Sequence, residues 1–184
     1  MKLSIIIPVY NEINYLERFT KNLMDSFNDQ NAEYIFVNDG STDGSTEWLI
    51  NFKKSYLLKH PNNNFILINL KENMGKGLAL RKGLESAAGD YILFQDSDLE
   101  LEPKDSLEMF EIIKKNSEMK VIFGSRFISG KLRSNKNFLN ELIGKLNSII
   151  FNILYRQSIS DLHCGTKIIS KEVIDKMKLT IKDF

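Results

Sequence analysis

The sequence predicts an α/β fold in which a mostly parallel sheet is flanked by helices. Short apolar runs without polar alternation recur along the chain, which is typical of parallel strands that are covered on both faces. Helical patterns separate these runs, and strand and helix alternate four times, as in a sheet built with right-handed crossovers. The expected strands are Leu3–Ile7, Tyr34–Val37, Phe65–Ile68, Tyr91–Phe94 and Val121–Phe123, and the expected helices are Asn14–Phe27, Ser45–Leu58, Leu78–Ala88 and Lys104–Asn116.

Local signals support these elements in the second half of the core. Gly89 and Asp90 combine a helix stop with the start of the fourth strand, and Pro103 marks the entry to the fourth helix. After the fifth strand the charge composition changes: residues 126–136 carry four positive charges and no acid. An amphipathic helical pattern rich in Leu, Ile and Phe follows over Phe138–Tyr155.

The composition is that of a folded domain without an overall charge. With 184 residues, of which 42% are hydrophobic and 27% are charged, the chain can bury a sizeable core. We expect one domain with two parts, an α/β core over residues 1–125 and a C-terminal part over residues 126–184. The net charge of +1 gives no whole-molecule field that favours nucleic acid, so any anion site must be local. The single cysteine, Cys164, rules out an internal disulfide and a cysteine-based metal site.

The N-terminal apolar run is too short for a signal peptide, and no stretch has the roughly 20 apolar residues of a membrane span. We therefore expect a cytoplasmic protein.

Polar clusters follow the predicted strands, where an open α/β sheet collects its ligands. The cluster after the first strand contains Pro8, Tyr10, Asn11 and Glu12. An ordinary turn with Asn11 or Asn14 as the helix cap is an equally good interpretation.

The second strand ends at Asp39, which is followed by a turn of small residues. Helix capping explains Thr42, Asp43 or Ser45, but it does not explain Asp39, a carboxylate at a strand tip that could bind a ribose hydroxyl or a base N–H. The sequence lacks the glycine patterns of dinucleotide-binding and P-loop proteins.

The third strand leads to a stretch with two glycines and two cations. Gly75 and Gly77 let the backbone approach a ligand closely, and Lys76 and Arg81 could reach a phosphate. A surface-exposed lysine is the alternative interpretation of Lys76.

The fourth strand ends in alternating carboxylates. Asp96, Asp98 and Glu100 would point to one face of an extended chain, where they would repel one another and raise their own pKa values. A hard divalent cation such as Mg²⁺ or Mn²⁺ takes oxygen ligands and leaves coordination places for substrate phosphates. The alternative is a solvated acidic turn before a helix, but the position at the same sheet edge as the other polar clusters favours a metal site.

Five stretches occur in the order and at the intervals of a known family: IIIPVYNE, VNDGSTDGS, NMGKGLALRKGL, GDYILFQDSDLELEP and VIFGSRF. With this set the chain resembles the family 2 inverting glycosyltransferases of GT-A fold, and among them the dolichyl-phosphate mannose and glucose synthases and bacterial polyprenyl-phosphate sugar transferases. The resemblance covers about residues 3–170. It implies a Rossmann-like sheet with the nucleotide-sugar site at the carboxyl ends of its strands, so that residues 1–125 would bind the donor.

The resemblance also implies roles for individual residues. Asp96 and Asp98 would form the D-x-D motif that bridges Mg²⁺ or Mn²⁺ and the donor diphosphate, with Asp98 catalytic, and Glu100 stands where the dolichyl-phosphate branch has a third metal contact. The implied donor-nucleotide residues are Pro8, Tyr10, Glu12, Asp39, Lys76, Asp96 and Ser97, the implied metal ligands are Asp96, Asp98 and Glu100, and Arg126 would face a phosphate near the acceptor.

The nature of the acceptor decides whether a base is needed. A phosphate acceptor is already ionised at neutral pH, whereas a hydroxyl acceptor needs a general base, for which Asp161 is the candidate. His163 could touch the donor or acceptor phosphate, or it could be a polar loop residue.

The basic loop with Arg126, Lys131, Arg133 and Lys136, followed by the amphipathic helix, would suit a lipid phosphate at the inner face of a membrane, with peripheral contact through residues 126–155. A surface loop and a helix packed on the sheet are the alternative.

Three functions follow as hypotheses. The first is metal-dependent transfer of a hexose from a UDP- or GDP-sugar to a polyprenyl or dolichyl phosphate. The second is the same donor chemistry with a glycan or other hydroxyl acceptor in capsule or lipopolysaccharide synthesis, and the third is a non-catalytic nucleotide-sugar-binding module. Family members usually continue beyond this length, whereas this sequence ends at IKDF, so we expect a truncated form, or else a minimal one.

Overall fold

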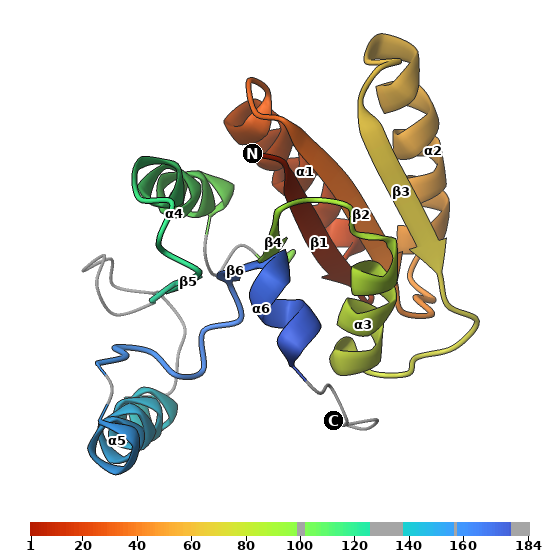
Figure 1. Ribbon diagram of the computed structural model, residues 1–184. Coiled ribbons are helices and arrows are strands. Elements are labelled where there is room, and N and C mark those ends of the chain that lie inside the picture. The colour runs from red at the N-terminus through yellow and green to blue at the C-terminus, as the bar shows by residue number, and fades with distance from the viewer. Residues whose placement is uncertain (99–101, 126–137, 157, 178–184) are drawn as a thin grey trace.

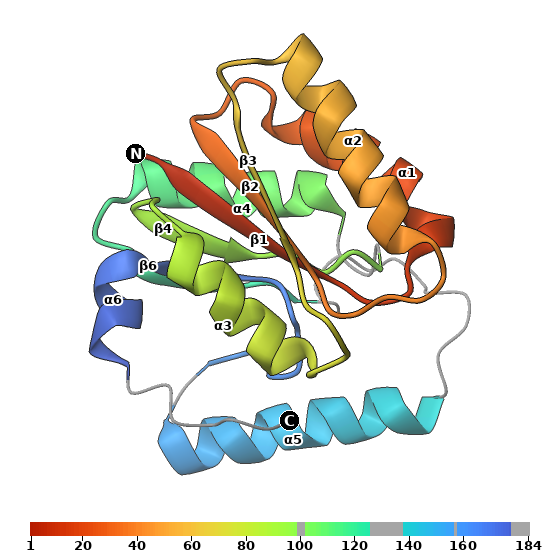
Figure 2. The same ribbon diagram turned by 90° about the vertical axis from the view of Figure 1, so that its right-hand side faces the viewer.

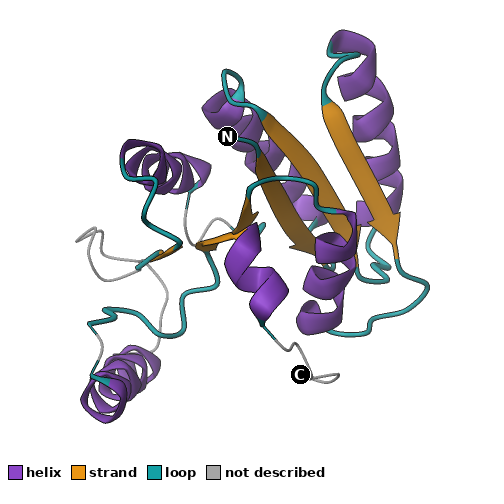
Figure 3. Cartoon of the chain, viewed as in Figure 1, coloured by secondary structure: helices purple, strands orange, loops and turns teal. Residues whose placement is uncertain are grey.

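A computed structural model describes residues 1–98, 102–125, 138–156 and 158–177 of the chain. These residues contain a six-stranded sheet with the order β3-β2-β1-β4-β6-β5 (Figures 1 and 3). The strands are β1 (Leu3–Val9), β2 (Ala32–Asn38), β3 (Asn64–Asn69), β4 (Tyr91–Phe94), β5 (Val121–Phe123) and β6 (Lys167–Ser170). The helices are α1 (Ile13–Phe27), α2 (Ser45–Lys59), α3 (Lys76–Ser86), α4 (Pro103–Lys115), α5 (Phe138–Tyr155) and α6 (Lys171–Lys176).

The sheet is mostly parallel, as the sequence predicts. Strand β1 pairs in parallel with both β2 and β4, and β2 pairs in parallel with β3. Strand β6 runs antiparallel to its two neighbours, β4 and β5, so β5 has the same direction as β1 to β4. The carboxyl ends of β1, β2 and β4 therefore meet at one edge of the sheet.

Helices cover both faces of the sheet. Figures 1 and 2 show α1, α2 and α4 on one face and α3 and α6 on the other. The first face packs around large side chains such as Phe19, Phe36 and Phe110, and the second around smaller ones such as Ile6 and Ala79. Because successive residues of a strand point to opposite faces, a strand covered on both sides needs an unbroken apolar run, which is the pattern of β1 and β2.

Most of the predicted boundaries shift by one or two residues, and one strand and one short helix were not predicted. Helix α3 begins and ends two residues earlier than Leu78–Ala88, because Gly75 adopts φ +88° and the helix starts directly after it. Strand β6 and the short helix α6 were not predicted. Only two isoleucines mark β6, and its place in the sheet comes from pairing with β4 and β5 rather than from a long apolar run.

Helix α5 is amphipathic as predicted, but Figures 1 and 2 show it lying outside the two helical layers, so it does not pack on the sheet. Its polar side faces the rest of the protein: Asn152 exchanges hydrogen bonds of 2.9 Å with the backbone of Ile159, and Ser148 accepts one of 3.0 Å from the N–H of Leu162. Its exposed apolar residues include Leu146, Ile149, Ile150, Ile153 and Leu154. In the described part of the chain, no helix combines the length and hydropathy that crossing a membrane would require.

A buried carboxylate joins the elements at the opposite, amino-terminal edge of the sheet. The side chain of Glu33 is fully buried and accepts hydrogen bonds from Lys2, Ser4, Asn64 and the N–H of Ala88. Burial alone would raise the pKa of Glu33, but the hydrogen bonds from Lys2, Ser4 and Ala88, together with the charge of Lys2, hold it below its ordinary value.

We predict that this network makes stability depend on pH. Since the folded-state pKa of Glu33 is lowered, its contribution is present above the unfolded value of 4.5 and is lost as the pH falls through the folded value. Glu33→Gln should lower the free energy of unfolding at pH 7 by about 1–3 kcal/mol and should remove part of the loss seen on acidification. Urea denaturation between pH 3 and 7 measures both effects. Glu85, an exposed residue that pairs with Lys82, provides the control. Glu85→Gln should change the free energy of unfolding by less than about 0.5 kcal/mol.

Candidate functional site

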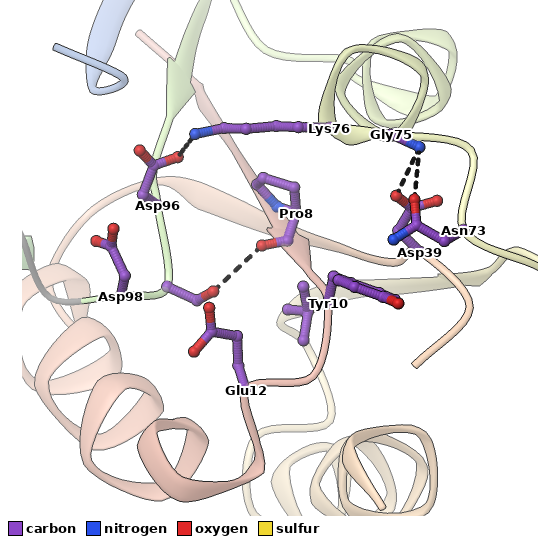
Figure 4. A pocket seen from close by; sticks show the side chains of 11 residues that line it. Pro8, Tyr10, Glu12, Asp39, Asn73, Gly75, Lys76, Asp96 and Asp98 are labelled. Atoms are coloured by element: carbon purple, nitrogen blue, oxygen red, sulfur yellow. Dashed lines mark hydrogen bonds and ion pairs between the residues drawn. The ribbon is translucent and has the colours of Figure 1, made fainter. Parts of the chain in front are cut away.

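A cavity of about 340 Å³ opens at the carboxyl edge of the parallel strands (Figure 4). Its lining comes from the ends of β1, β2 and β4 and from the entry to α3. The lining residues are Pro8, Val9, Tyr10, Glu12, Asp39, Asn73, Gly75, Lys76, Asp96, Ser97 and Asp98. Eight of them belong to the predicted site, and the parallel sheet brings them together.

Hydrogen bonds tie the loop after β1 to the loop after β2. Asn11 has a positive φ of 56°, a conformation that asparagine tolerates better than most residues. Its N–H donates to Ser41 Oγ at 3.0 Å, and its side-chain oxygen accepts from the N–H of Thr42 at 2.8 Å. Asp43 accepts from the N–H of Ile13 at 3.0 Å. Asn11 and Asp43 thus connect two loops, while Glu12 and Gly44 occupy the helix N-cap positions without a side-chain cap bond.

Asp39, directly after β2, holds the loop between β3 and α3 at the carboxyl edge of the sheet. Its side chain is buried, and its two oxygens accept hydrogen bonds from the N–H groups of Met74 and Gly75 at 2.8 and 2.9 Å (Figure 4). Next to it, Gly40 has φ +67°, and a Cβ at this position would lie 2.6 Å from the backbone nitrogen of Asn73. The loops after β2 and β3 therefore touch through backbone atoms, which requires glycine at position 40.

The other half of the cavity is lined by three carboxylates, those of Glu12, Asp96 and Asp98, and by the ammonium group of Lys76. Lys76 Nζ lies 2.6 Å from Asp96 Oδ1, Figure 4 shows Asp98 near Asp96, and Glu12 lines the same cavity. Burial raises the pKa of Glu12 above its ordinary value, and the negative charges of Asp98, Asp43 and Asp96 raise it further. The cavity is therefore a place where an additional positive charge would be stabilised.

The strand end that carries the aspartates is held by polar contacts. Ser97 is buried, and its hydroxyl donates to the carbonyl of Pro8 at 3.3 Å. Gln95 is fully buried, accepts a hydrogen bond from Ser106 of α4 and donates one of 3.1 Å to the carbonyl of Asp96. The chain bends at Ser97 and Asp98, so the directions of the two aspartates come from these contacts rather than from an extended strand.

The carboxylates fit the expected divalent cation. Asp96, Asp98 and Glu12 line one cavity, so three carboxylates lie close to the place that the cation would occupy. Within the residues that the structure describes, no group of three His, Cys, Asp or Glu side chains is placed to hold a metal ion. Mg²⁺ and Mn²⁺ sites often use only one or two protein carboxylates and take further ligands from substrate phosphates and water. Glu100, the third ligand that the resemblance implies, lies outside the described residues.

The predicted acceptor residues are placed differently. Arg126 and Arg133 lie outside the described residues. Asp161 is fully buried and His163 is exposed, and neither lines the cavity. His163 Nε2 lies 3.1 Å from the side-chain amide of Asn147 on α5.

Sequence reasoning did not identify Val9 or Asn73 as lining residues. Their exposure to the cavity depends on how the loops fold back, and no local pattern in the sequence marks it.

A parallel sheet with a carboxylate-lined cavity at its carboxyl edge defines the class of α/β domains that bind ligands at this edge. Comparison with known proteins narrows the class. A mannosyltransferase from Pyrobaculum calidifontis, solved in complex with GDP-Man and Mn²⁺, matches with a TM-score of 0.68 and 20% identity over 98% of this chain and 48% of that chain. This similarity confirms the predicted GT-A fold.

Sequence comparison identifies the family. A dolichyl-phosphate beta-glucosyltransferase of Dictyostelium discoideum is 30% identical in an alignment of 190 positions, gaps included, which covers 97% of this chain and 57% of that protein. A dolichol-phosphate mannosyltransferase of Pyrococcus furiosus is 29% identical over 181 residues, or 97% of this chain and 49% of that protein. The family model for glycosyl transferase family 2 matches residues 4–178, and the chain belongs to this family. It spans about half the length of the curated relatives it matches.

We predict that the charge of Asp98 acts on Glu12. Asp98→Asn removes the largest of the neighbouring charges that raise the pKa of Glu12, so this pKa should fall toward its ordinary value while burial keeps it above. Carbon-13 NMR titration of the glutamate carboxyl groups measures the change. Asp25→Asn, an exposed position further along α1, is the matched control and should leave the Glu12 titration unchanged. An unaltered Glu12 pKa in Asp98→Asn would contradict the charge coupling.

Proposed function

We propose that the chain transfers a hexose, with inversion, from a UDP- or GDP-sugar to a polyprenyl or dolichyl phosphate in a metal-dependent reaction. The observation that carries the proposal is the convergence of Asp96, Asp98 and Lys76 with Asp39 in one cavity at the carboxyl edge of the sheet. Family membership and the names of the two dolichyl-phosphate relatives support it. The activity and the substrates stay a proposal because the chain spans about half of those proteins.

The donor nucleoside would bind beside the loops after β1 and β2. Tyr10 is 46% exposed and lines the cavity with Pro8, so the two present apolar surface to a base. Each oxygen of Asp39 already accepts one backbone hydrogen bond, but a carboxylate oxygen has a second lone pair that can accept from a ribose hydroxyl or a base N–H.

The donor diphosphate would bind between α3 and the end of β4. Asp96 and Asp98 would hold the cation there, and Lys76 would exchange its contact with Asp96 for a phosphate oxygen. A bound divalent cation supplies Lewis-acid stabilisation of the negative charge that the leaving diphosphate gains.

Transfer to a phosphate acceptor requires fewer catalytic residues than transfer to a hydroxyl, because an ionised phosphate needs no general base. The base candidate for a hydroxyl acceptor, Asp161, is fully buried and lies outside the lining of the cavity, which favours the phosphate.

Membrane contact through α5 is part of the proposal. The polar side of the helix is used in hydrogen bonds to Ile159 and Leu162, so its apolar side faces outward, with Ile149 55% and Ile153 73% exposed. An outward apolar helix face, preceded in the sequence by the basic segment 126–136, suits the surface of an anionic membrane that carries the acceptor.

The function is tested with donors and acceptors offered separately. We expect one UDP- or GDP-sugar to raise the melting temperature in the presence of Mn²⁺, and sugar to be transferred to polyprenyl phosphate but not to sugar hydroxyls. Asp98→Asn should lower turnover by about 10²-fold or more and weaken Mn²⁺-dependent nucleotide binding. Its folding should be little changed, because Asp98 is exposed in the bend that follows β4.

Three results would overturn parts of this proposal. Unchanged metal-dependent nucleotide affinity in Asp98→Asn would contradict the role of the aspartate. Transfer to sugar hydroxyls alone would favour the second acceptor class, and nucleotide-sugar binding without transfer or hydrolysis would favour the binding module.

We also predict that α5 mediates vesicle binding. Removing two isoleucine side chains from the apolar face forfeits roughly 1.5–3 kcal/mol each, so Ile149→Glu with Ile153→Glu should weaken co-sedimentation with anionic phosphatidylglycerol vesicles at least about tenfold. Leu58→Glu on α2 is the matched control, because Leu58 is an isolated apolar residue with 85% of its surface exposed. Equal losses in both variants would contradict a specific role of α5.

A further inference from the structure

Gly165 lies directly against the carboxylate of Asp96. A Cβ built on Gly165 would overlap Asp96 Oδ2 and would lie 3.0 Å from its Cγ. The φ of Gly165 is outside the left-handed region, so this angle does not itself require glycine. The Asp96 side chain, and not the backbone, therefore accounts for glycine at position 165.

The carboxylate of Asp96 is held on its other side by Lys76. Lys76 Nζ contacts Oδ1 at 2.6 Å, and 19% of the Asp96 side chain remains exposed toward the cavity. The direction of the carboxylate is thus fixed by contacts on two sides: Lys76, the first residue of α3, contacts Oδ1, and Gly165, in the segment before β6, lies against Oδ2.

That segment is itself fixed by the sheet. Strand β6 is inserted between β4 and β5, where Lys167 pairs with Phe94 on one side and with Phe123 on the other. Just before the strand, the carbonyl of Thr166 accepts from the N–H of Gly124 at 3.0 Å. Gly165 is consequently anchored next to the end of β4, and Asp96 follows that end by two residues.

We propose that Gly165 is a positioning residue for Asp96: it leaves the space that one carboxylate oxygen occupies, and it thereby sets the direction in which Asp96 faces the cavity. The consequence for a bound cation and diphosphate rests on the proposed function. The steric relation between the two residues does not.

The same segment continues to α5. Leu162 and His163 contact Ser148 and Asn147 of that helix, three and two residues before Gly165. Gly165 therefore joins the donor side of the site to the part of the chain that we assign to the acceptor and the membrane.

Gly165→Ala tests the proposal. The added methyl group meets the end of a short side chain that borders the cavity, so we expect the carboxylate of Asp96 to rotate and the fold to persist. A crystal structure of the variant without ligands should show the contact between Lys76 and Asp96 broken. Calorimetric titration with Mn²⁺ plus UDP, and with Mn²⁺ plus GDP, should show about 10- to 100-fold weaker binding with little change in the melting temperature.

Gly44→Ala is the matched control. It also adds one methyl group to a loop at this edge, but nothing lies within 4 Å of the new atom, and its φ of +97° strains the backbone instead. It should lower the melting temperature and leave the direction of Asp96 and the nucleotide affinity unchanged.

Two results would overturn the proposal: an Asp96 carboxylate that keeps its direction in Gly165→Ala, or the same loss of affinity in both glycine variants. If the unmodified chain binds neither UDP nor GDP with Mn²⁺, the proposed function fails, and the structure of Gly165→Ala still decides whether Gly165 positions Asp96.

Discussion

The parallel pairing of β1 with both β2 and β4 decides where the carboxylates of the site lie. Because the three strands run in one direction, the loops that follow them leave the sheet at one edge and bring Glu12, Asp39 and Asp96 to the same cavity. The register cannot slip by one residue without moving the apolar side chains of β1 to the wrong face. Packing of the core therefore fixes the geometry of the site, although the site residues contribute little to the core.

The acids at the two edges of the sheet have pKa values shifted in opposite directions. At the amino-terminal edge, Glu33 is surrounded by donors, and its pKa is lowered. At the carboxyl edge, partial burial and the negative charges of Asp98, Asp43 and Asp96 raise the pKa of Glu12. The hydrogen bonds and the charge of Lys2 balance the charge of Glu33, whereas in the proposed function a cation and its ligand would balance the charges at the carboxyl edge. Shifts of the second kind are concentrated at functional sites.

Helix α5 shows that an amphipathic pattern does not specify which side is covered. Its asparagine and serine side chains hold the segment before β6, so its apolar side is left exposed. The segment held in this way ends at Gly165, beside Asp96. The outermost helix is thus connected, through one short segment, to the centre of the proposed donor site.

The sequence by itself determined the α/β class, the five predicted strands and their helices, because apolar runs and the polar residues after them are local features. The family resemblance then selected the eight predicted residues that line the cavity, among them Ser97, which no local pattern marks. The sequence did not determine the antiparallel insertion of β6, the outward face of α5 or the contact between Gly165 and Asp96. Only the tertiary structure decided these, since they join residues far apart in the chain and depend on strand order and on the space left between packed segments.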